Sequence, residues 1–255
     1  MNNRGMSPEE SALPLAWLEP GDPFPPLSAA WGPDSSAPGL LAAGERLDSG
    51  LLLQAYRQGI FPWFSQGQPV LWWSPDPRMV LDPQHFRMRR SLRQSLRHWQ
   101  AQAGMELVFD RDFAEVITRC ASQQRPGQNG SWILPGMVQA YTGLHKQGLA
   151  HSAELRLHGR LVAGLYFVAL GHAVFGESMF TTVPDGSKLA LSLLVSVARH
   201  HGIRMIDCQQ NTRHLASLGA AEIARAQFVR QLQQAQTRPA IDWARETLYC
   251  NELFP

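Results

Sequence analysis

A single carboxylate interrupts an apolar stretch in the second half of the chain. Residues 174–180 read Val-Phe-Gly-Glu-Ser-Met-Phe, so Glu177 has apolar neighbours on both sides. A buried carboxylate without a partner costs on the order of several kcal/mol, so Glu177 needs one. One interpretation is an ion pair with Lys188 or an arginine. The other is that Glu177 awaits the ammonium group of a ligand, with Met179 lining an apolar pocket beside it, as the recognition of a hydrophobic amino acid would require.

Two further polar residues, Asp207 and Gln209, lie two positions apart in the segment Ile-Asp-Cys-Gln. At the end of a strand this spacing directs both side chains to the same face. Asp207 could simply cap the helical turn predicted at residues 211–219. Alternatively, the two residues form a pair at the open end of a sheet, where α/β proteins bind ligands. Because an amide is no base at neutral pH, the carboxylate would then supply the charge and Gln209 would orient the reactant.

A basic region precedes both of these segments. Although the net charge of the chain is only +2, positions 78 to 97 contain six arginines and one acidic residue, Asp82. Within the helix predicted over 86–99, arginines recur along one face without glutamates four residues away, which would be their usual partners. A solvated helix face is the ordinary interpretation, but this pattern favours contact with phosphates or RNA. The arginines are Arg78, Arg87, Arg89, Arg90, Arg93 and Arg97.

Two tryptophans also lie in segments suited to binding. Trp63 and Trp132 each lie close to proline or glycine in predicted loops. Either could be an ordinary core residue, and either could be a platform on which a nucleic-acid base stacks.

The elements that position these residues divide the chain into three parts. Eight of the eighteen prolines fall within the first 38 residues, which predicts an extended or poorly ordered N-terminal extension over 1–37. Residues 38–84 are expected to form a small α+β domain, with a helix capped by Asp48 or Ser49 and two short strands joined by a Gln-Gly turn. Residues 85–255 are expected to form the larger domain.

The larger domain is predicted to build a mixed sheet. A strand and two helices are followed by three strands in an antiparallel meander, a nearly apolar helix at 187–202 and a further short strand. This order predicts an α+β fold class with a mixed α/β sheet, and it is the order of the acyl-CoA N-acyltransferase (GNAT-like) fold.

Composition and motifs exclude several classes of protein. The chain is 44% hydrophobic and 17% charged, as expected of a folded domain with a core, and it has no apolar run of the roughly 18 residues that a membrane span needs. No secretory signal is evident, and three scattered cysteines fit a reducing cytoplasm. Nucleotide-binding glycine motifs and the pyrophosphate loop of acetyltransferases are also missing, so we expect neither a coenzyme A donor nor any cofactor or metal.

From about residue 39 to 225 the sequence resembles the leucyl/phenylalanyl-tRNA–protein transferase family. The resemblance is carried by the motifs Gly-Ile-Phe-Pro-Trp, Trp-Trp-Ser-Pro-Asp-Pro-Arg, Gly-Glu-Ser-Met-Phe and Ile-Asp-Cys-Gln. It implies an enzyme that moves Leu, Phe or Met from aminoacyl-tRNA to proteins with an N-terminal Lys or Arg, marking them for degradation. It also implies a GNAT-like C-terminal domain, a small N-terminal domain and, as we expect, a cytoplasmic monomer without a cofactor.

The resemblance assigns roles to the residues singled out above. It implies that Glu177 holds the α-amino group of the donor aminoacyl ester and that Asp207 and Gln209 are the catalytic pair. The remaining assignments are Ser178, Met179 and Phe180 for the aminoacyl side chain, Trp63 and Trp132 for the 3′-terminal adenosine, and Arg78, Arg89, Arg90, Arg93 and Arg97 for the acceptor stem. A competing hypothesis is a non-enzymatic RNA-binding module on a degenerate acyltransferase fold. The joint presence of Glu177, Asp207 and Gln209 favours catalysis, because a pure binder has no use for all three.

Overall fold

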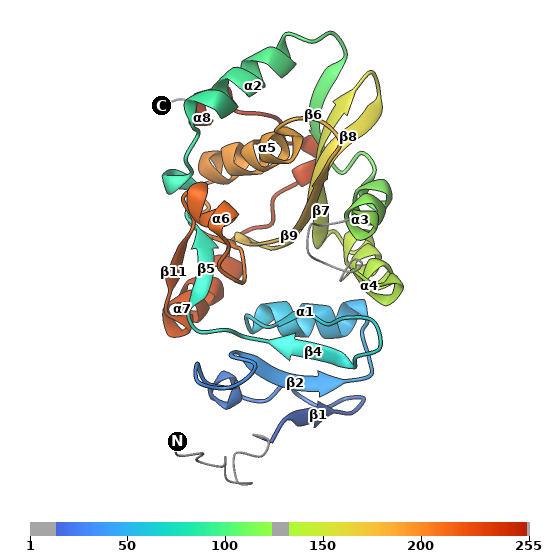
Figure 1. The fold of residues 1–255 in the computed structure, drawn as a ribbon, viewed down its shortest axis with the longest axis vertical. Coiled ribbons are helices and arrows are strands. Elements are labelled where there is room, and N and C mark those ends of the chain that lie inside the picture. Colours follow the sequence, from blue (N-terminus) through green and yellow to red (C-terminus); the bar gives the residue numbers. More distant parts are fainter. Residues whose placement is uncertain (1–13, 124–132, 254–255) are drawn as a thin grey trace, which may run out of the picture.

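A computed structural model describes residues 14–123 and 133–253. It contains two sheets, connected through the segment that follows Trp73 (Figure 1). The strands of the smaller, N-terminal sheet and the two helices between them in the sequence are β1 (Ala16–Leu18), η1 (Leu27–Ala29), β2 (Leu40–Gly44), α1 (Ser49–Arg57), β3 (Phe61–Pro62) and β4 (Val70–Trp73).

The N-terminal sheet has the order β1-β2-β4-β3, with β1 parallel to β2 and the other pairs antiparallel. Helix α1 begins at Ser49 because the carboxylate of Asp48 accepts a hydrogen bond from the backbone N–H of Leu51. The predicted helix and the hairpin of β3 and β4 are therefore confirmed. Residues 14–37 are mostly without regular secondary structure, as predicted, but they also contribute strand β1 to this sheet.

Among the described residues, the larger sheet has seven strands in the order β11-β5-β10-β9-β8-β7-β6, and β9 and β10 are its one parallel pair. Its strands are β5 (Arg78–Leu81), β6 (Met105–Phe109), β7 (Ala150–Leu157), β8 (Arg160–Leu170), β9 (Ala173–Thr181), β10 (Ile206–Asp207) and β11 (Ala221–Ile223). The predicted mixed sheet and its meander are confirmed. The predicted boundary at residue 84 is too late, because β5 already belongs to the larger sheet.

Helices cover both faces of the larger sheet (Figure 1). The remaining elements are η2 (Pro83–His85), α2 (Arg90–Gln100), α3 (Phe113–Ser122), α4 (Pro135–Lys146), α5 (Gly186–His200), α6 (Arg213–Ser217), α7 (Arg225–Gln236), η3 (Trp243–Arg245) and α8 (Cys250–Leu253). One buried cluster lies between the sheet and α1, α3, α4 and α7, and a second lies between the sheet and α2, α5 and α8. We call these two sides the α4 face and the α5 face.

The apolar pattern of the helices explains this arrangement. Helix α5 buries eleven of its fifteen residues, which agrees with the nearly apolar sequence from which a buried helix was predicted. Within the ranges that the structure describes, no helix combines the length and the apolar character needed to cross a membrane.

Candidate active site

Glu177 occupies an irregularity in strand β9. Phe167 of β8 pairs with Gly176 and the preceding Tyr166 pairs with Ser178, so Glu177 has no partner on β8. Such a β-bulge inserts one residue into one strand of an antiparallel pair and redirects its side chain. Alternation along β9 already directs Glu177 to the α4 face, which Phe175 also faces, and the bulge leaves Glu177 without a partner on β8.

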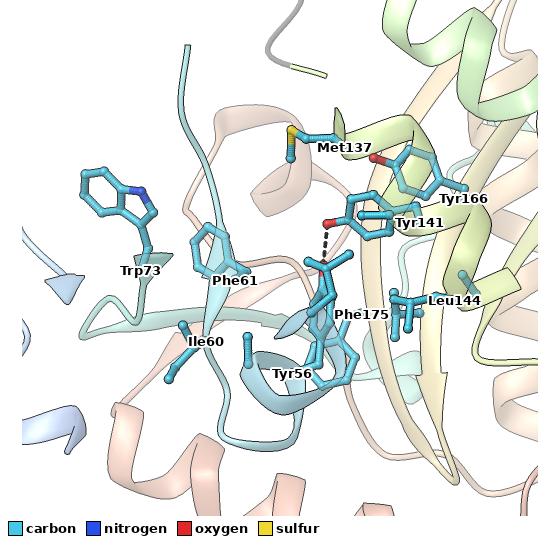
Figure 2. Packing of buried hydrophobic residues seen from close by; sticks show 14 of the residues in the cluster. Tyr56, Ile60, Phe61, Trp73, Met137, Tyr141, Leu144, Tyr166 and Phe175 are labelled. Atoms are coloured by element: carbon cyan, nitrogen blue, oxygen red, sulfur yellow. Dashed lines mark hydrogen bonds between the residues drawn. The ribbon is translucent and has the colours of Figure 1, made fainter. Parts of the chain in front are cut away.

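Two tyrosines bind this carboxylate. The hydroxyl of Tyr56, from α1, donates to Oε1 of Glu177 at 2.7 Å, and the hydroxyl of Tyr141, from α4, donates to Oε2 at 2.9 Å. The amide Nε2 of Gln209 donates to Oε1 at 3.3 Å. Figure 2 shows the two tyrosine hydroxyls meeting among Phe175 and other buried aromatic side chains. Since one tyrosine comes from the N-terminal part of the chain, both parts build the site.

The interpretation that Glu177 forms an ion pair with Lys188 or an arginine is wrong. Lys188 instead lies 2.6 Å from Asp185, at the start of α5. In the described parts of the chain Glu177 forms no ion pair at all. Its direct partners are three neutral donors, which leaves its charge without a cation in contact.

The surroundings of Glu177 shift its ionisation. Burial of the carboxyl among protein atoms raises the pKa of Glu177 from 4.5 to about 7, and the nearby Asp207 adds to this rise. The hydrogen bonds from the two tyrosines and the charge of Arg78 oppose it. Burial also raises the pKa of both tyrosines well above 10, so they remain hydrogen-bond donors at neutral pH.

Asp207 lies beside this cluster and is fully buried. Arg78 donates to it twice, from Nε to Oδ1 at 2.8 Å and from Nη2 to Oδ2 at 2.6 Å. The backbone N–H of Gln209 donates to Oδ1 at 3.0 Å, and Gln209 has a left-handed backbone with φ of 56°. Sequence reasoning brought Asp207 and Gln209 together correctly, but their contact uses the backbone of Gln209, and its side chain turns to Glu177.

Asp207 therefore does not cap the following helix. The side chain of Thr212 caps α6, where its Oγ1 accepts from the backbone N–H of Leu215. The capping interpretation of Asp207 is wrong.

Arg78 was predicted to contact tRNA together with the other arginines, and the structure contradicts this grouping. Its side chain is 0% exposed, and its guanidinium lies 4.7 Å from the ring of Phe61 and 4.5 Å from the ring of Phe228. The physical reason is its place in β5, whose four residues are all buried between β10 and β11.

The remaining arginines of the predicted tRNA site are exposed on or next to α2. This helix buries Leu92 and Leu96 against the α5 face and begins at Arg90, later than predicted. No acidic residue lies in its first turn. The arginines that form this surface, the basic face of α2, are Arg89, Arg90, Arg93 and Arg97. Their contact with tRNA stays a prediction.

The structure does not bring Met179 to Glu177. Met179 pairs with Leu165 and packs on the α5 face, whereas Glu177 points to the α4 face. The predicted pocket of Met179 beside Glu177 is wrong because the bulge interrupts the alternation of the strand. Ser178 and Phe180 are 5% and 3% exposed, and Phe180 packs in the α4-face core. A contact of either residue with substrate stays a prediction that this buried placement does not favour.

Trp63 is placed as a stacking platform would be. It is 40% exposed, its ring lies 5.6 Å from that of Trp73, and its carbonyl accepts a hydrogen bond from Nε1 of Trp73. Its contact with adenosine stays a prediction. Trp132 lies outside the described residues.

Other chemistries find little support near this cluster. Burial raises the pKa of the Cys208 thiol to about 12, which disfavours the thiolate that a nucleophile requires. Among the residues that the structure describes, no group of three or more His, Cys, Asp and Glu side chains is placed to hold a metal ion.

Tyr56 and Tyr141 are the functional candidates that sequence reasoning missed. The tyrosines reach Glu177 across 121 and 36 positions of sequence, so no local motif joins them. The one available signal was a tyrosine on the apolar face of a predicted helix, since a buried tyrosine hydroxyl needs a hydrogen-bond partner.

Comparison with known proteins gives consistent matches. The family model described as leucyl/phenylalanyl-tRNA protein transferase matches residues 80–233, and the model of that family's N-terminal domain matches 45–76. Proteins named leucyl/phenylalanyl-tRNA–protein transferase include one from a Polaromonas species, 58% identical over 241 residues that cover 94% of each chain. Another, from Albidiferax ferrireducens, is 55% identical and covers 94% of this chain and 95% of its own.

Solved structures give weaker matches. L-PGS from Bacillus licheniformis has a TM-score of 0.36 at 12% identity, over 75% of this chain and 64% of its own. A GCN5-related N-acetyltransferase from Kribbella flavida has a TM-score of 0.32 at 12% identity, over 69% of this chain and 61% of its own. Similarities this low carry no argument.

Proposed function

The chain belongs to the leucyl/phenylalanyl-tRNA–protein transferase family, whose members transfer an aminoacyl group from tRNA to protein, and we propose its substrates and the roles of its residues as follows. The donor is tRNA charged with Leu, Phe or Met. The acceptor is a protein with an N-terminal Lys or Arg, which thereby gains a hydrophobic N-terminal residue that marks it for degradation.

The observation that carries this proposal is the uncompensated charge of Glu177. Its carboxylate is held by Tyr56, Tyr141 and Gln209, all of them neutral, and the residue keeps some solvent exposure. A carboxylate bound only by neutral donors attracts an ammonium group, because an opposite charge nearby favours its charged form. The α-amino group of the donor aminoacyl ester is the ammonium that we assign to it.

The reaction asks little of the protein beyond positioning. The amine of the acceptor attacks the carbonyl carbon of the ester, the bond to the 3′ oxygen of tRNA breaks, and the attacking nitrogen loses a proton while the leaving oxygen gains one. Holding ester and amine together lowers the barrier, and dipoles aimed at the developing oxyanion lower it further. The amide of Gln209 is the donor that we place at the reacting groups.

Asp207 acts through its charge and not as a base. Both of its oxygens already accept hydrogen bonds from Arg78 or from the backbone of Gln209, and the side chain is fully buried. A base must reach the proton that it removes. This packing supports an electrostatic and orienting part for Asp207, with the proton leaving by another route.

The tRNA end of the donor is assigned to Trp63 and the basic face of α2. An exposed indole suits stacking of the terminal adenine, and exposed arginines suit phosphate contacts that are indifferent to sequence. A coenzyme A thioester is a poorer donor here. Asp185 directly precedes α5, and its carboxylate is bound by Lys188 and Ser95, so the start of this helix already carries an anion where a pyrophosphate would have to bind.

The test is transfer of radiolabelled leucine from leucyl-tRNA to two peptides that differ only in an N-terminal Arg or Ala. We expect label on the Arg peptide alone, loss of transfer in Glu177→Ala and Asp207→Ala, and tRNA binding close to wild type in both variants. Label that stays on the tRNA while binding is detectable would support the RNA-binding module instead. Equal loss of binding and transfer in both variants would contradict the division of roles.

A further inference from the structure

The ion pair of Arg78 and Asp207 joins strand β5 to strand β10 at the centre of the site. Both side chains are 0% exposed, and two parallel hydrogen bonds connect the guanidinium to the carboxylate. Paired bonds of this kind fix the orientation of both groups as well as holding their charges together. The third nitrogen of the guanidinium, Nη1, has no hydrogen-bond partner in the described part of the structure, so the polar contacts of this side chain are directed at Asp207.

Aromatic rings hold the guanidinium in place. Phe61 of β3 lies 4.7 Å from its central carbon and Phe228 of α7 lies 4.5 Å away. Both rings are buried, as is the guanidinium between them. A cation next to aromatic rings in a desolvated place is stabilised there.

A chain of contacts leads from Arg78 to Glu177. Asp207, fixed by Arg78, accepts from the backbone N–H of Gln209. That bond holds Gln209 in a left-handed backbone conformation, which residues other than glycine rarely adopt without support. In this conformation the amide of Gln209 reaches Oε1 of Glu177.

We propose that Arg78 is the positioning residue of the transfer reaction: it fixes Asp207, and through Asp207 it sets the backbone of Gln209 and the direction of its amide. This inference rests on the roles proposed above for Glu177, Asp207 and Gln209. It assigns to Arg78 no contact with substrate. A lysine at this position keeps the charge but loses the paired geometry.

The pKa of Glu177 is a second measure of the effect of Arg78 on the site, and it does not depend on how much of a variant folds. The ionisable groups that face Glu177 are Tyr56 on α1, Tyr141 on α4, Asp207 on β10 and Arg78 on β5. Arg78 is the cation among them, and its charge lowers the pKa of Glu177. Neutral Arg78→Gln therefore shifts the acidic limb of the pH–rate profile to higher pH, whereas Arg78→Lys leaves it near the wild-type position.

The decisive comparison is between Arg78→Lys and Arg156→Lys. Arg156 of β7 forms a buried pair with Glu154 at 2.7 Å and otherwise donates to the carbonyl of Gly159, so its replacement weakens the fold in a similar way. We measure kcat and KM for leucyl-tRNA per folded protein. For Arg78→Lys we expect kcat to fall roughly 10- to 100-fold with KM changed less than about threefold, as for a misplaced catalytic group. For Arg156→Lys we expect both constants to stay close to wild type.

A second pair of variants decides the matter if Arg78→Lys does not fold. Phe228→Leu removes one ring beside the guanidinium, and Phe109→Leu makes the same change in the α5-face core. A loss of kcat in Phe228→Leu but not in Phe109→Leu supports the inference. The inference is overturned if Arg78→Lys is as active per folded protein as Arg156→Lys, and Phe228→Leu as active as Phe109→Leu. It is also overturned if the acidic limb of the pH–rate profile of Arg78→Gln stays at the wild-type pH.

These outcomes separate this inference from the proposed function. If only the positioning role of Arg78 is wrong, Glu177→Gln loses transfer, whereas Arg78→Lys transfers label at the wild-type rate. If the proposed function is wrong, wild type itself transfers no label, and if the role proposed for Glu177 is wrong, Glu177→Gln transfers label as well as wild type, whatever Arg78→Lys does.

Discussion

The hydroxyl oxygens of Tyr56 and Tyr141 lie 2.6 Å apart while each also contacts a different oxygen of Glu177. The three side chains thus form a closed ring of three short oxygen–oxygen contacts. Each contact needs one proton to be a hydrogen bond. The two tyrosines supply two protons, and the third is available only when Glu177 is protonated.

The ionisation of Glu177 changes which of these three contacts are hydrogen bonds. When the carboxyl is ionised, both tyrosines donate to it and their own hydroxyl oxygens face each other without a proton between them. When it is protonated, all three contacts are hydrogen bonds. Burial favours the neutral acid, and an incoming ammonium favours the carboxylate.

We predict that binding of the donor end releases protons. With the pKa of Glu177 at about 7, the carboxyl is mostly protonated at pH 6.5 and ionises when an ammonium binds. Calorimetry with an adenosine that carries leucine through a stable 3′ amide should show a binding enthalpy that depends on the ionisation enthalpy of the buffer, in the sense of proton release. Glu177→Gln, which has no proton to release, is the control. Proton uptake by wild type, or an equal proton release by Glu177→Gln, would contradict the assignment of the released proton to Glu177.

Removing a tyrosine hydroxyl should move the acidic limb of the transfer reaction. The hydrogen bond from Tyr56 lowers the pKa of Glu177, so Tyr56→Phe raises it above about 7, and activity is then lost at a higher pH as the solution is acidified. A hydrogen bond to a charged group contributes roughly 1.5 kcal/mol, which corresponds to about one pH unit. Tyr249→Phe removes a comparable bond to Glu246 on the α5 face and should leave the profile unchanged. A limb that stays in place in Tyr56→Phe would show that another group sets it.

Glu177 should also make the fold less stable as the pH rises. Its pKa is 4.5 in an unfolded chain and about 7 in the folded protein, so between these values the folded state binds more protons than the unfolded state. Raising the pH through this window therefore lowers the free energy of unfolding, by roughly 3 kcal/mol at most. Urea unfolding should show that the free energy of unfolding of Glu177→Gln, relative to that of wild type, is higher at pH 8 than at pH 4 by up to this amount. Glu106→Gln, at a position where the side chain is 40% exposed, should show no such gain, and the same result for both variants would contradict the assignment.

The basic face of α2 should govern how tRNA binding depends on salt. Replacing Arg89, Arg93 and Arg97 together by Gln should weaken binding and reduce the slope of log K against log salt by about two to three, since each phosphate contact contributes roughly 0.7 to 0.9. The matched triple replacement of Arg111, Arg160 and Arg245, which are exposed elsewhere, should leave the slope unchanged. An equal slope in the two triple variants would remove the tRNA role of α2.

Local sequence patterns predicted most of the elements but not the way that they meet. The capped start of α1, the buried helix α5 and the meander of β7, β8 and β9 follow from periodicity and capping within short windows. Strand β1 was not predicted, because three residues among prolines carry little signal and its pairing with β2 spans more than twenty positions. Strand β5 was assigned to the small domain because its partners, β10 and β11, lie more than a hundred residues later.

The site was predictable where a residue breaks a local rule. Glu177 was found because a charge interrupts an apolar strand, and Asp207 and Gln209 because polar residues end one. Arg78 was misplaced because neighbouring arginines suggested a shared surface, although the apolar residues that follow it indicate a buried strand. The tyrosines were missed because their hydroxyls are polar atoms on residues that otherwise match an apolar face.

The unpaired residue in β9 also has a consequence for how such a site can arise. In a regular strand every second side chain faces the same side, so exchanging one amino acid for another leaves the direction of all its neighbours unchanged. Glu177 faces the tyrosines while Met179 faces α5 because the strand carries one residue more than its partner. An ancestor with a regular strand would have reached this arrangement through a change in length, and libraries of point substitutions built on such a strand would not contain it.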